Sequence, residues 1–141
     1  MPLFTHDTKV EALKRAPLFA SFSRHELEEL AKATEDLAFD EGKVLAREGE
    51  IGQEFFVILD GEVAVTRDHA EVRRLSSGDF FGEIALIWES ARRTATVTAT
   101  TPVRLFVLTR QSFRSLLAHH PDIERKVLAA LEQRIGTDFG V

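Results

Sequence analysis

The sequence contains no cysteine and no tyrosine, and it has only one tryptophan and one methionine. The lack of cysteine excludes disulfides, thiolate metal sites and a cysteine nucleophile. Basic residues are not in excess: the sequence has 18 Lys and Arg and 23 Asp and Glu, which gives a net charge of −5. A surface that binds nucleic acid without sequence preference needs a basic excess, so we expect no nucleic-acid partner.

Long apolar runs are also missing. No run approaches the ~18 residues that a membrane span needs, and residues 1–15 lack the apolar core of a signal peptide. We therefore expect a cytoplasmic chain without a membrane segment. The five histidines include no His-x-His pair with a following Glu, and no Ser-His-Asp or paired-carboxylate spacing is present. Accordingly we predict no metal site, no catalytic residues and no enzymatic activity.

The composition is otherwise ordinary for a globular domain. Of 141 residues, 44 % are apolar and 29 % charged, which is enough for one domain with a core. We predict a single domain over residues 1–141, with a helical entry (1–36), a β-rich middle (37–108) and a helical exit (109–136). Only 136–141 follow the last predicted helix, which ends at Ile135, so we expect no helix-turn-helix there. The start at Met1 favours a stand-alone protein.

Two capping-box spacings, Thr8–Glu11 and Ser23–Glu26, predict two helices in the entry. The second helix is expected over 24–37, with an apolar stripe at Leu27, Leu30, Ala31 and Thr34. In the exit, Phe113, Leu116 and Leu117 predict a short helix, and Pro121 is placed to begin the last one.

From about Leu37 the apolar period changes to two, which is typical of strands. Asp60-Gly61 between two apolar runs is a strong hairpin signal. Further turns are predicted at four places: Gly49–Gly52, Asp68–Ala70, Ser77–Asp79 and Thr101–Pro102. Short, evenly spaced strands predict an α+β fold: an eight-stranded antiparallel, jelly-roll-like β-roll with N-terminal helices and two C-terminal helices.

Residues 81–97 carry the chemistry. Gly82 stands before a single helical turn, Glu83–Leu86, where a bare backbone can approach a ligand. The first amides of such a turn have no acceptor within it and carry positive partial charge. The segment therefore predicts an anion site, suited to phosphate.

Strand parity supplies a cation for the same site. If Ala95, Val97 and Ala99 face the interior, Arg93 shares that face and Arg92 lies on the other. A buried guanidinium needs an anionic partner, and its fork matches phosphate oxygens. Glu83 is then a natural acceptor for a sugar hydroxyl. The alternative is that Glu83 and Arg93 form a buried ion pair with no ligand.

The run Phe81–Leu86, followed by Arg93–Val97, resembles the phosphate-binding cassette of cyclic-nucleotide-binding domains. Such domains occur in the kinase A regulatory subunit, the catabolite activator protein and cyclic-nucleotide-gated channels. The hairpin around Gly49, Phe56–Ile58 and Asp60-Gly61 is similar to that family as well, and the likeness extends from about Val10 to Ile135.

The resemblance implies a ligand, cyclic AMP or else cyclic GMP, and a set of contacts. The phosphate and sugar edge would meet the backbone of Gly82, Ile84 and Ala85, Glu83 would accept from the ribose 2′-hydroxyl, and Arg93 would pair with the cyclic phosphate. Thr94 would add a hydroxyl contact to the phosphate or the base, and Ala95 belongs to the same set of ligand-binding residues. Val65 and Leu75 would pack on the base, and the final helix would form a lid near Leu131 and Arg134.

Three alternatives stay open from the sequence. The first is which arginine binds the phosphate, since Arg92 fits a shorter form of the cassette and Arg93 a longer one. The cassette also departs from the family pattern, because it lacks the Gly or Pro often found near Glu89–Ala91. The second alternative is that the chain is a family member that has lost ligand binding and acts as a protein-interaction scaffold. The third is a small enzyme built on a β-barrel. The protein partner and the oligomeric state are not specified.

Overall fold

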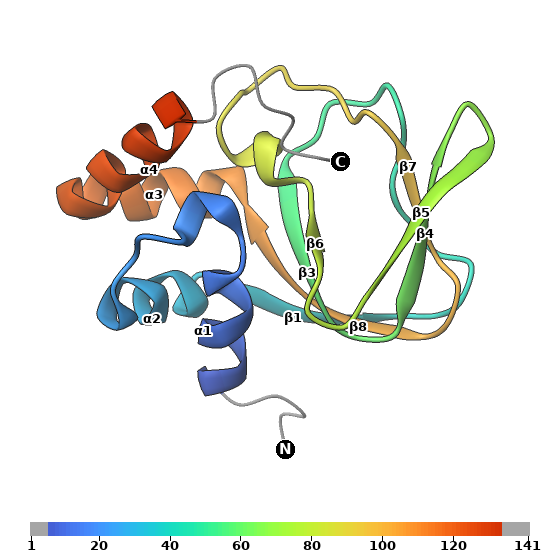
Figure 1. The fold of residues 1–141 in the computed structure, drawn as a ribbon, viewed down its shortest axis with the longest axis horizontal. Helices are drawn as coiled ribbons and strands as arrows, with labels where there is room; N and C mark the ends of the chain where they lie inside the picture. Colours follow the sequence, from blue (N-terminus) through green and yellow to red (C-terminus); the bar gives the residue numbers. More distant parts are fainter. Residues whose placement is uncertain (1–5, 134–141) are drawn as a thin grey trace.

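The computed structural model describes residues 6–133. The chain enters through α1 (His6–Lys14), the short 3₁₀ helix η1 (Pro17–Phe19) and α2 (Arg24–Lys32), and it leaves through α3 (Arg110–His119) and α4 (Pro121–Gln133). Figure 1 shows these helices together at one end of the molecule, with the strands forming a roll at the other.

Eight strands lie between the helices within the described chain. They are β1 (Glu35–Phe39), β2 (Val44–Ala46), β3 (Glu54–Asp60), β4 (Glu62–Arg67), β5 (Ala70–Ser76), β6 (Phe80–Phe81), β7 (Thr96–Ala99) and β8 (Val103–Thr109). They form two four-stranded sheets with the orders β1-β8-β3-β6 and β2-β7-β4-β5, and all their pairings are antiparallel. The predicted α+β fold, an eight-stranded roll between N-terminal and C-terminal helices, is confirmed.

The helix boundaries confirm some local predictions and correct others. Ser23 caps α2, and Ser23 and Glu26 form both bonds of a capping box. By contrast, α1 begins at His6, so Thr8 lies inside the helix instead of capping it. The end of α2 at Lys32, well before Leu37, is a further correction, because Glu35–Phe39 pairs with β8 as a strand.

The exit helices and the turns follow the sequence signals. Pro121 is the first residue of α4, as predicted. The Asp60-Gly61 turn joins β3 to β4, and Asp68 and His69 take positive φ angles in the turn before β5. Among the helices of residues 6–133, none combines the length and the apolar character needed to cross a bilayer.

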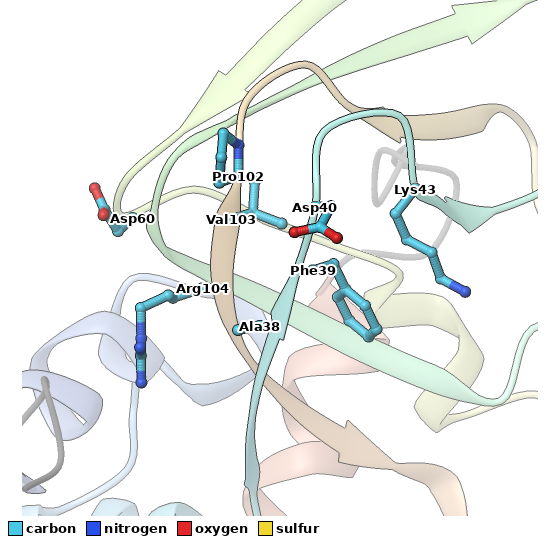
Figure 2. Close-up of a pocket in the computed structure, with 8 residues that line it drawn as sticks. All are labelled: Ala38, Phe39, Asp40, Lys43, Asp60, Pro102, Val103 and Arg104. Atoms are coloured by element: carbon cyan, nitrogen blue, oxygen red, sulfur yellow. The ribbon is translucent and has the colours of Figure 1, made fainter.

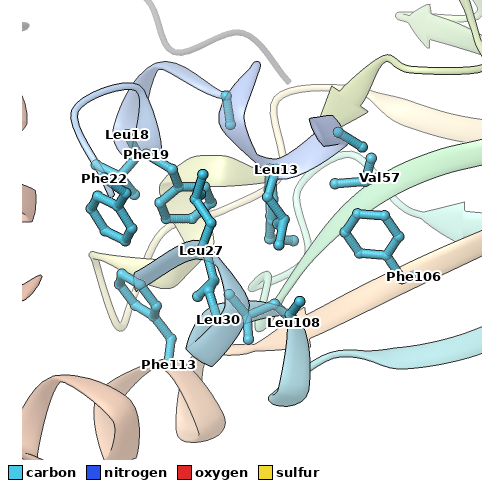
Figure 3. Packing of buried hydrophobic residues seen from close by; sticks show 14 of the residues in the cluster. Leu13, Leu18, Phe19, Phe22, Leu27, Leu30, Val57, Phe106, Leu108 and Phe113 are labelled. Atoms are coloured by element: carbon cyan, nitrogen blue, oxygen red, sulfur yellow. The ribbon is translucent and has the colours of Figure 1, made fainter. Parts of the chain in front are cut away.

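Two apolar clusters share the strands β3 and β8. Successive side chains of a strand point to opposite faces, so Phe55 and Val57 face the helices while Phe56 and Ile58 face the inside of the roll. Figure 3 shows the helix-side cluster, in which Phe19 lies among Leu13, Leu27 and Phe113. The helices are thereby packed on the outer face of the sheet from which the cassette begins.

Candidate functional site

The cassette begins where β6 ends. Phe81 pairs with Phe56 across the strands, and the two rings stack with centroids 4.6 Å apart. The next residue, Gly82, has φ of 85°, a left-handed conformation that reverses the chain into the single 3₁₀ turn η2 (Glu83–Leu86). The predicted helical turn is thus present, and it starts at the rim of the roll.

The loop between β2 and β3 holds the far end of the cassette. The amide of Gly52 donates to the carbonyl of Ala91 (3.0 Å), and the amide of Arg93 donates to the carbonyl of Glu50 (2.8 Å). In return, the amide of Gly49 donates to the carbonyl of Arg93 (2.9 Å). Three main-chain hydrogen bonds therefore fix the backbone from which the Arg93 side chain extends.

The side chain of Arg93 is buried, with only 8 % of its surface exposed. It lies against two glycines: a Cβ on Gly52 would meet its Nε and Cζ at 2.6 Å, and a Cβ on Gly82 would meet its Nη1 at 2.6 Å. Nη2 donates to the main-chain carbonyl of Glu54 at 2.9 Å. Nη1 is buried and has no hydrogen-bond acceptor among the described residues.

The surroundings of this guanidinium hold groups of both signs. Nη2 lies 3.9 Å from Oε1 of Glu54, and the group stands over the ring of Phe56, 5.7 Å from its centroid. Burial lowers the pKa of Arg93 below its ordinary value, the carboxylate of Glu54 partly raises it again, and the nearby charge of Arg110 lowers it. Arg93 is thus a partly desolvated cation, which favours an additional anionic neighbour.

The two adjacent arginines have different environments. Arg92 is exposed, and its Nη1 donates to the carbonyl of Gly49 at 2.7 Å. On the strand that follows, Ala95, Val97 and Ala99 are each 1 % exposed, so their predicted inward orientation is confirmed. The regular strand β7 begins only at Thr96, but the alternation of buried and exposed side chains continues back to Arg93.

Most of the other predicted site residues lie around the same rim or inside the roll. Glu83 and Ala85 are each 1 % exposed, Ile84 is half-buried and Thr94 is exposed. Val65 and Leu75 are buried in the interior cluster that also contains Ala95. Of the two lid residues, Leu131 belongs to α4 but its side chain lies outside the described part, and Arg134 lies outside the described residues altogether.

Sequence reasoning missed Arg110. This first residue of α3 donates from Nε to the carbonyl of Ala85 (2.9 Å) and from Nη2 to the carbonyl of Gly52 (2.7 Å). It thus connects η2, the β2–β3 loop and the first C-terminal helix. Nothing in the local pattern distinguishes it from a surface arginine at a helix start, because all of its acceptors are main-chain carbonyls remote in sequence.

Glu54 was missed as well, although a signal for it exists. Residues two apart on a strand share a face, so an inward Phe56 places Glu54, the first residue of β3, on the same side. The sequence predicts a turn at Gly52, and the structure shows that the missing side chain also leaves space for the guanidinium of Arg93.

A separate hollow of about 620 Å³ lies at the opposite end of the roll, beside the start of β8. Figure 2 shows its charged lining, formed by Asp40, Lys43, Asp60 and Arg104, together with apolar neighbours such as Phe39. None of the predicted ligand contacts lines it. Its charges are of both signs, so it presents no concentration of positive charge for a phosphate.

Comparison with known proteins gives a consistent result. A family model described as "Cyclic nucleotide-binding domain" matches residues 37–120. The chain is 34 % identical over 127 residues to a cAMP-dependent protein kinase regulatory subunit of Schizosaccharomyces pombe, covering 89 % of this chain and 30 % of that protein. It is also 34 % identical over 131 residues to a cGMP-dependent protein kinase of Eimeria tenella, covering 92 % of this chain and 12 % of that protein.

A solved structure has the same fold over nearly its whole length. The N-terminal domain of a transcriptional regulator from Streptomyces coelicolor A3(2) aligns with a TM-score of 0.80 and 27 % identity, covering 88 % of this chain and 91 % of that one. The chain spans less than a third of the two kinase-related proteins, so it corresponds to one segment of each.

Proposed function

The chain belongs to the cyclic nucleotide-binding domain family, and from this premise we propose that it is a regulatory sensor that binds a cyclic purine mononucleotide. The ligand is cyclic AMP in preference to cyclic GMP. Its phosphate meets Arg93 at the Gly82 turn, and its base enters the roll toward Val65 and Leu75. The module acts by binding and carries out no catalysis.

The observation that carries this proposal is the buried Nη1 of Arg93, which has no hydrogen-bond acceptor within residues 6–133. A buried N–H without an acceptor costs free energy, and this one lies against Gly82, at the start of η2. The first amides of a helical turn point away from it without partners inside the turn. A phosphate at this point would accept from both the guanidinium and the turn, which supports a phosphate-bearing ligand.

The buried carboxyl group of Glu83 supports the choice of a nucleotide over a simple phosphate. It follows Gly82 directly and is 1 % exposed, so a ribose lying beside the phosphate can donate its 2′-hydroxyl to it. The apolar interior that begins at Ala95 and includes Val65 and Leu75 gives the base a surface on which to pack. Thr94 is compatible with either purine, so the choice of cyclic AMP is based on the similarity to a cAMP-dependent protein kinase regulatory subunit and not on a residue of the site.

The direct test is calorimetric titration with cyclic AMP, cyclic GMP, 2′-deoxy cyclic AMP and linear AMP. We expect cyclic AMP to bind most tightly. A hydrogen bond to a charged acceptor contributes ~1.5–3 kcal/mol, so the 2′-deoxy analogue is expected to bind about tenfold to a hundredfold more weakly. Binding of linear AMP as tight as that of cyclic AMP would refute the cyclic-phosphate assignment. No binding of any of the four would leave the protein-interaction scaffold as the better function.

We further propose that the ligand changes the position of α4. In the structure Ile123 and Val127 are buried in the helix-side cluster, and Lys126 pairs with Glu26 of α2, whereas Leu128 is 52 % exposed. Among the described side chains of α4, those on one face hold the helix against the body of the protein, so a ligand that contacts the end of α4 can change the position of the helix. A ligand shifts such an equilibrium only through contacts that differ between the two positions.

Hydrogen exchange measures this response. We expect amides of 122–135, the last of which lie outside the described residues, to exchange more slowly with cyclic AMP than without it. Amides in the centre of β3, buried between both clusters, exchange by global unfolding, so their slowing measures the overall stabilisation by the ligand and serves as the reference for the local response of α4. The same experiment on Arg93→Ala at the same nucleotide concentration is expected to show no slowing. Equal protection of α4 with and without nucleotide in the unaltered protein would exclude the lid.

A further inference from the structure

Glu54 contacts the same guanidinium group, that of Arg93, to which the phosphate is proposed to bind. Its main-chain carbonyl accepts from Nη2 at 2.9 Å, and Oε1 of its carboxylate lies 3.9 Å from the same nitrogen. The side chain is 47 % exposed, so the carboxylate stands at the rim of the site instead of being buried in it. On the other side of the guanidinium, Nη1 faces Gly82.

The charges around this point do not add up to a strongly positive site. Among the described residues, the charges that act on the guanidinium of Arg93 are those of Glu54 and Arg110. Glu83 adds a buried carboxyl group directly after Gly82. Sites built for doubly charged phosphate esters gather several cations, helix N-termini or a metal. Here one arginine meets the phosphate, and a carboxylate stands beside that arginine.

A cyclic phosphodiester and a phosphate monoester differ in charge. The cyclic diester has one ionised oxygen and a charge of −1, while a monoester carries about −1.5 to −2 at neutral pH. Coulomb energy is proportional to the product of the charges, so a fixed carboxylate repels the monoester up to about twice as strongly as the diester.

From this geometry we propose that Glu54 is a specificity-determining residue, which makes the site favour singly charged cyclic phosphodiesters over doubly charged phosphate monoesters. This inference rests on the proposed function, since it concerns the ligand of the same site. Glu54 discriminates between ligands by their charge, through electrostatic repulsion of the phosphate. Selection by the shape of the η2 turn does not depend on Glu54.

The test is Glu54→Gln, which keeps the size of the side chain and the main-chain carbonyl that accepts from Arg93. Affinities for cyclic AMP and linear AMP are measured by calorimetry at low salt, where screening is weakest. Removing the carboxylate charge is expected to strengthen binding of cyclic AMP about threefold and of linear AMP about tenfold, because the gain on a logarithmic scale follows the ligand charge. The difference between the two gains is expected to shrink as salt is raised.

Glu41→Gln is the matched control. It makes the same change of net charge at an exposed position in the turn between β1 and β2, and it is expected to leave both affinities unchanged. Equal gains for the two nucleotides in Glu54→Gln, or no gain for either, would overturn the role of Glu54 while the proposed function stood. If the unaltered protein bound neither nucleotide, the proposed function would fail first and this inference with it.

Discussion

Arg93→Ala is expected to weaken binding of cyclic AMP by about thirtyfold to a few thousandfold, and Arg92→Ala by no more than about fivefold. The first range corresponds to ~2–5 kcal/mol, the usual loss when one member of a buried, hydrogen-bonded charge pair is truncated. The second corresponds to at most ~1 kcal/mol for an exposed charge. The measurement is the dissociation constant of cyclic AMP for the two variants and the unaltered protein under identical conditions.

The contrast arises from where the two side chains lie. The guanidinium of Arg93 is enclosed by Gly52 and Gly82, with Nη1 directed at the start of η2. That of Arg92 is at the surface and donates to the carbonyl of Gly49, outside the roll. The two residues are neighbours of the same type, so each variant controls for the charge removed in the other.

Both variants are expected to fold. Removing Arg93 leaves the carbonyl of Glu54 without that donor, but it also removes a cation whose burial disfavours its charged form and lowers its pKa. These two effects oppose each other, so a cooperative unfolding transition is expected in both variants. If Arg92→Ala abolished binding and Arg93→Ala did not, the shorter form of the cassette would be correct and the assignment of the phosphate to Arg93 would fall.

Local sequence signals predicted the parts of the fold that local interactions determine. The Ser23 capping box, the Asp60-Gly61 hairpin and Pro121 at the start of α4 each depend on residues within a few positions. The end of α2 was predicted too late because Glu35–Phe39 has a helix-compatible pattern. Its pairing with β8, some seventy residues away, makes it a strand.

In the candidate site, too, features determined by neighbouring residues could be predicted and features determined by distant residues could not. The turn after Gly82 and the inward orientation of Arg93 could be predicted, because both follow from adjacent residues and strand parity. The contacts of Gly52 and Arg110 could not be predicted, since each depends on residues about 25 to 60 positions away. For Glu54, strand parity predicts the face on which it lies, but not its contact with Arg93, which is 39 positions away. A pattern in one segment carries no information about which distant carbonyl accepts its hydrogen bond.

Gly82→Ala is expected to lower stability by ~2–4 kcal/mol and to weaken binding of cyclic AMP by at least about tenfold, since two costs combine. The φ of 85° is a conformation in which a side chain other than that of glycine is strained. In addition, the new Cβ would lie 2.6 Å from Nη1 of Arg93 and 2.6 Å from the main-chain oxygen of Glu54. The arginine can rotate away, but the oxygen belongs to β3 and cannot move without disturbing the sheet.

Gly49→Ala separates the two costs. The φ of Gly49 is 87°, nearly the same as that of Gly82, and no heavy atom lies within 4 Å of an added Cβ. Gly49→Ala is therefore expected to lose stability through backbone strain alone, ~1–2 kcal/mol. Urea unfolding is expected to rank the unaltered protein above Gly49→Ala and Gly49→Ala above Gly82→Ala. Calorimetry is expected to show a large loss of affinity in Gly82→Ala only, because there the methyl group occupies the space in which Arg93 Nη1 meets the phosphate. Equal stability and equal affinity of the two variants would mean that Gly82 serves only to turn the chain, and that the phosphate is held elsewhere.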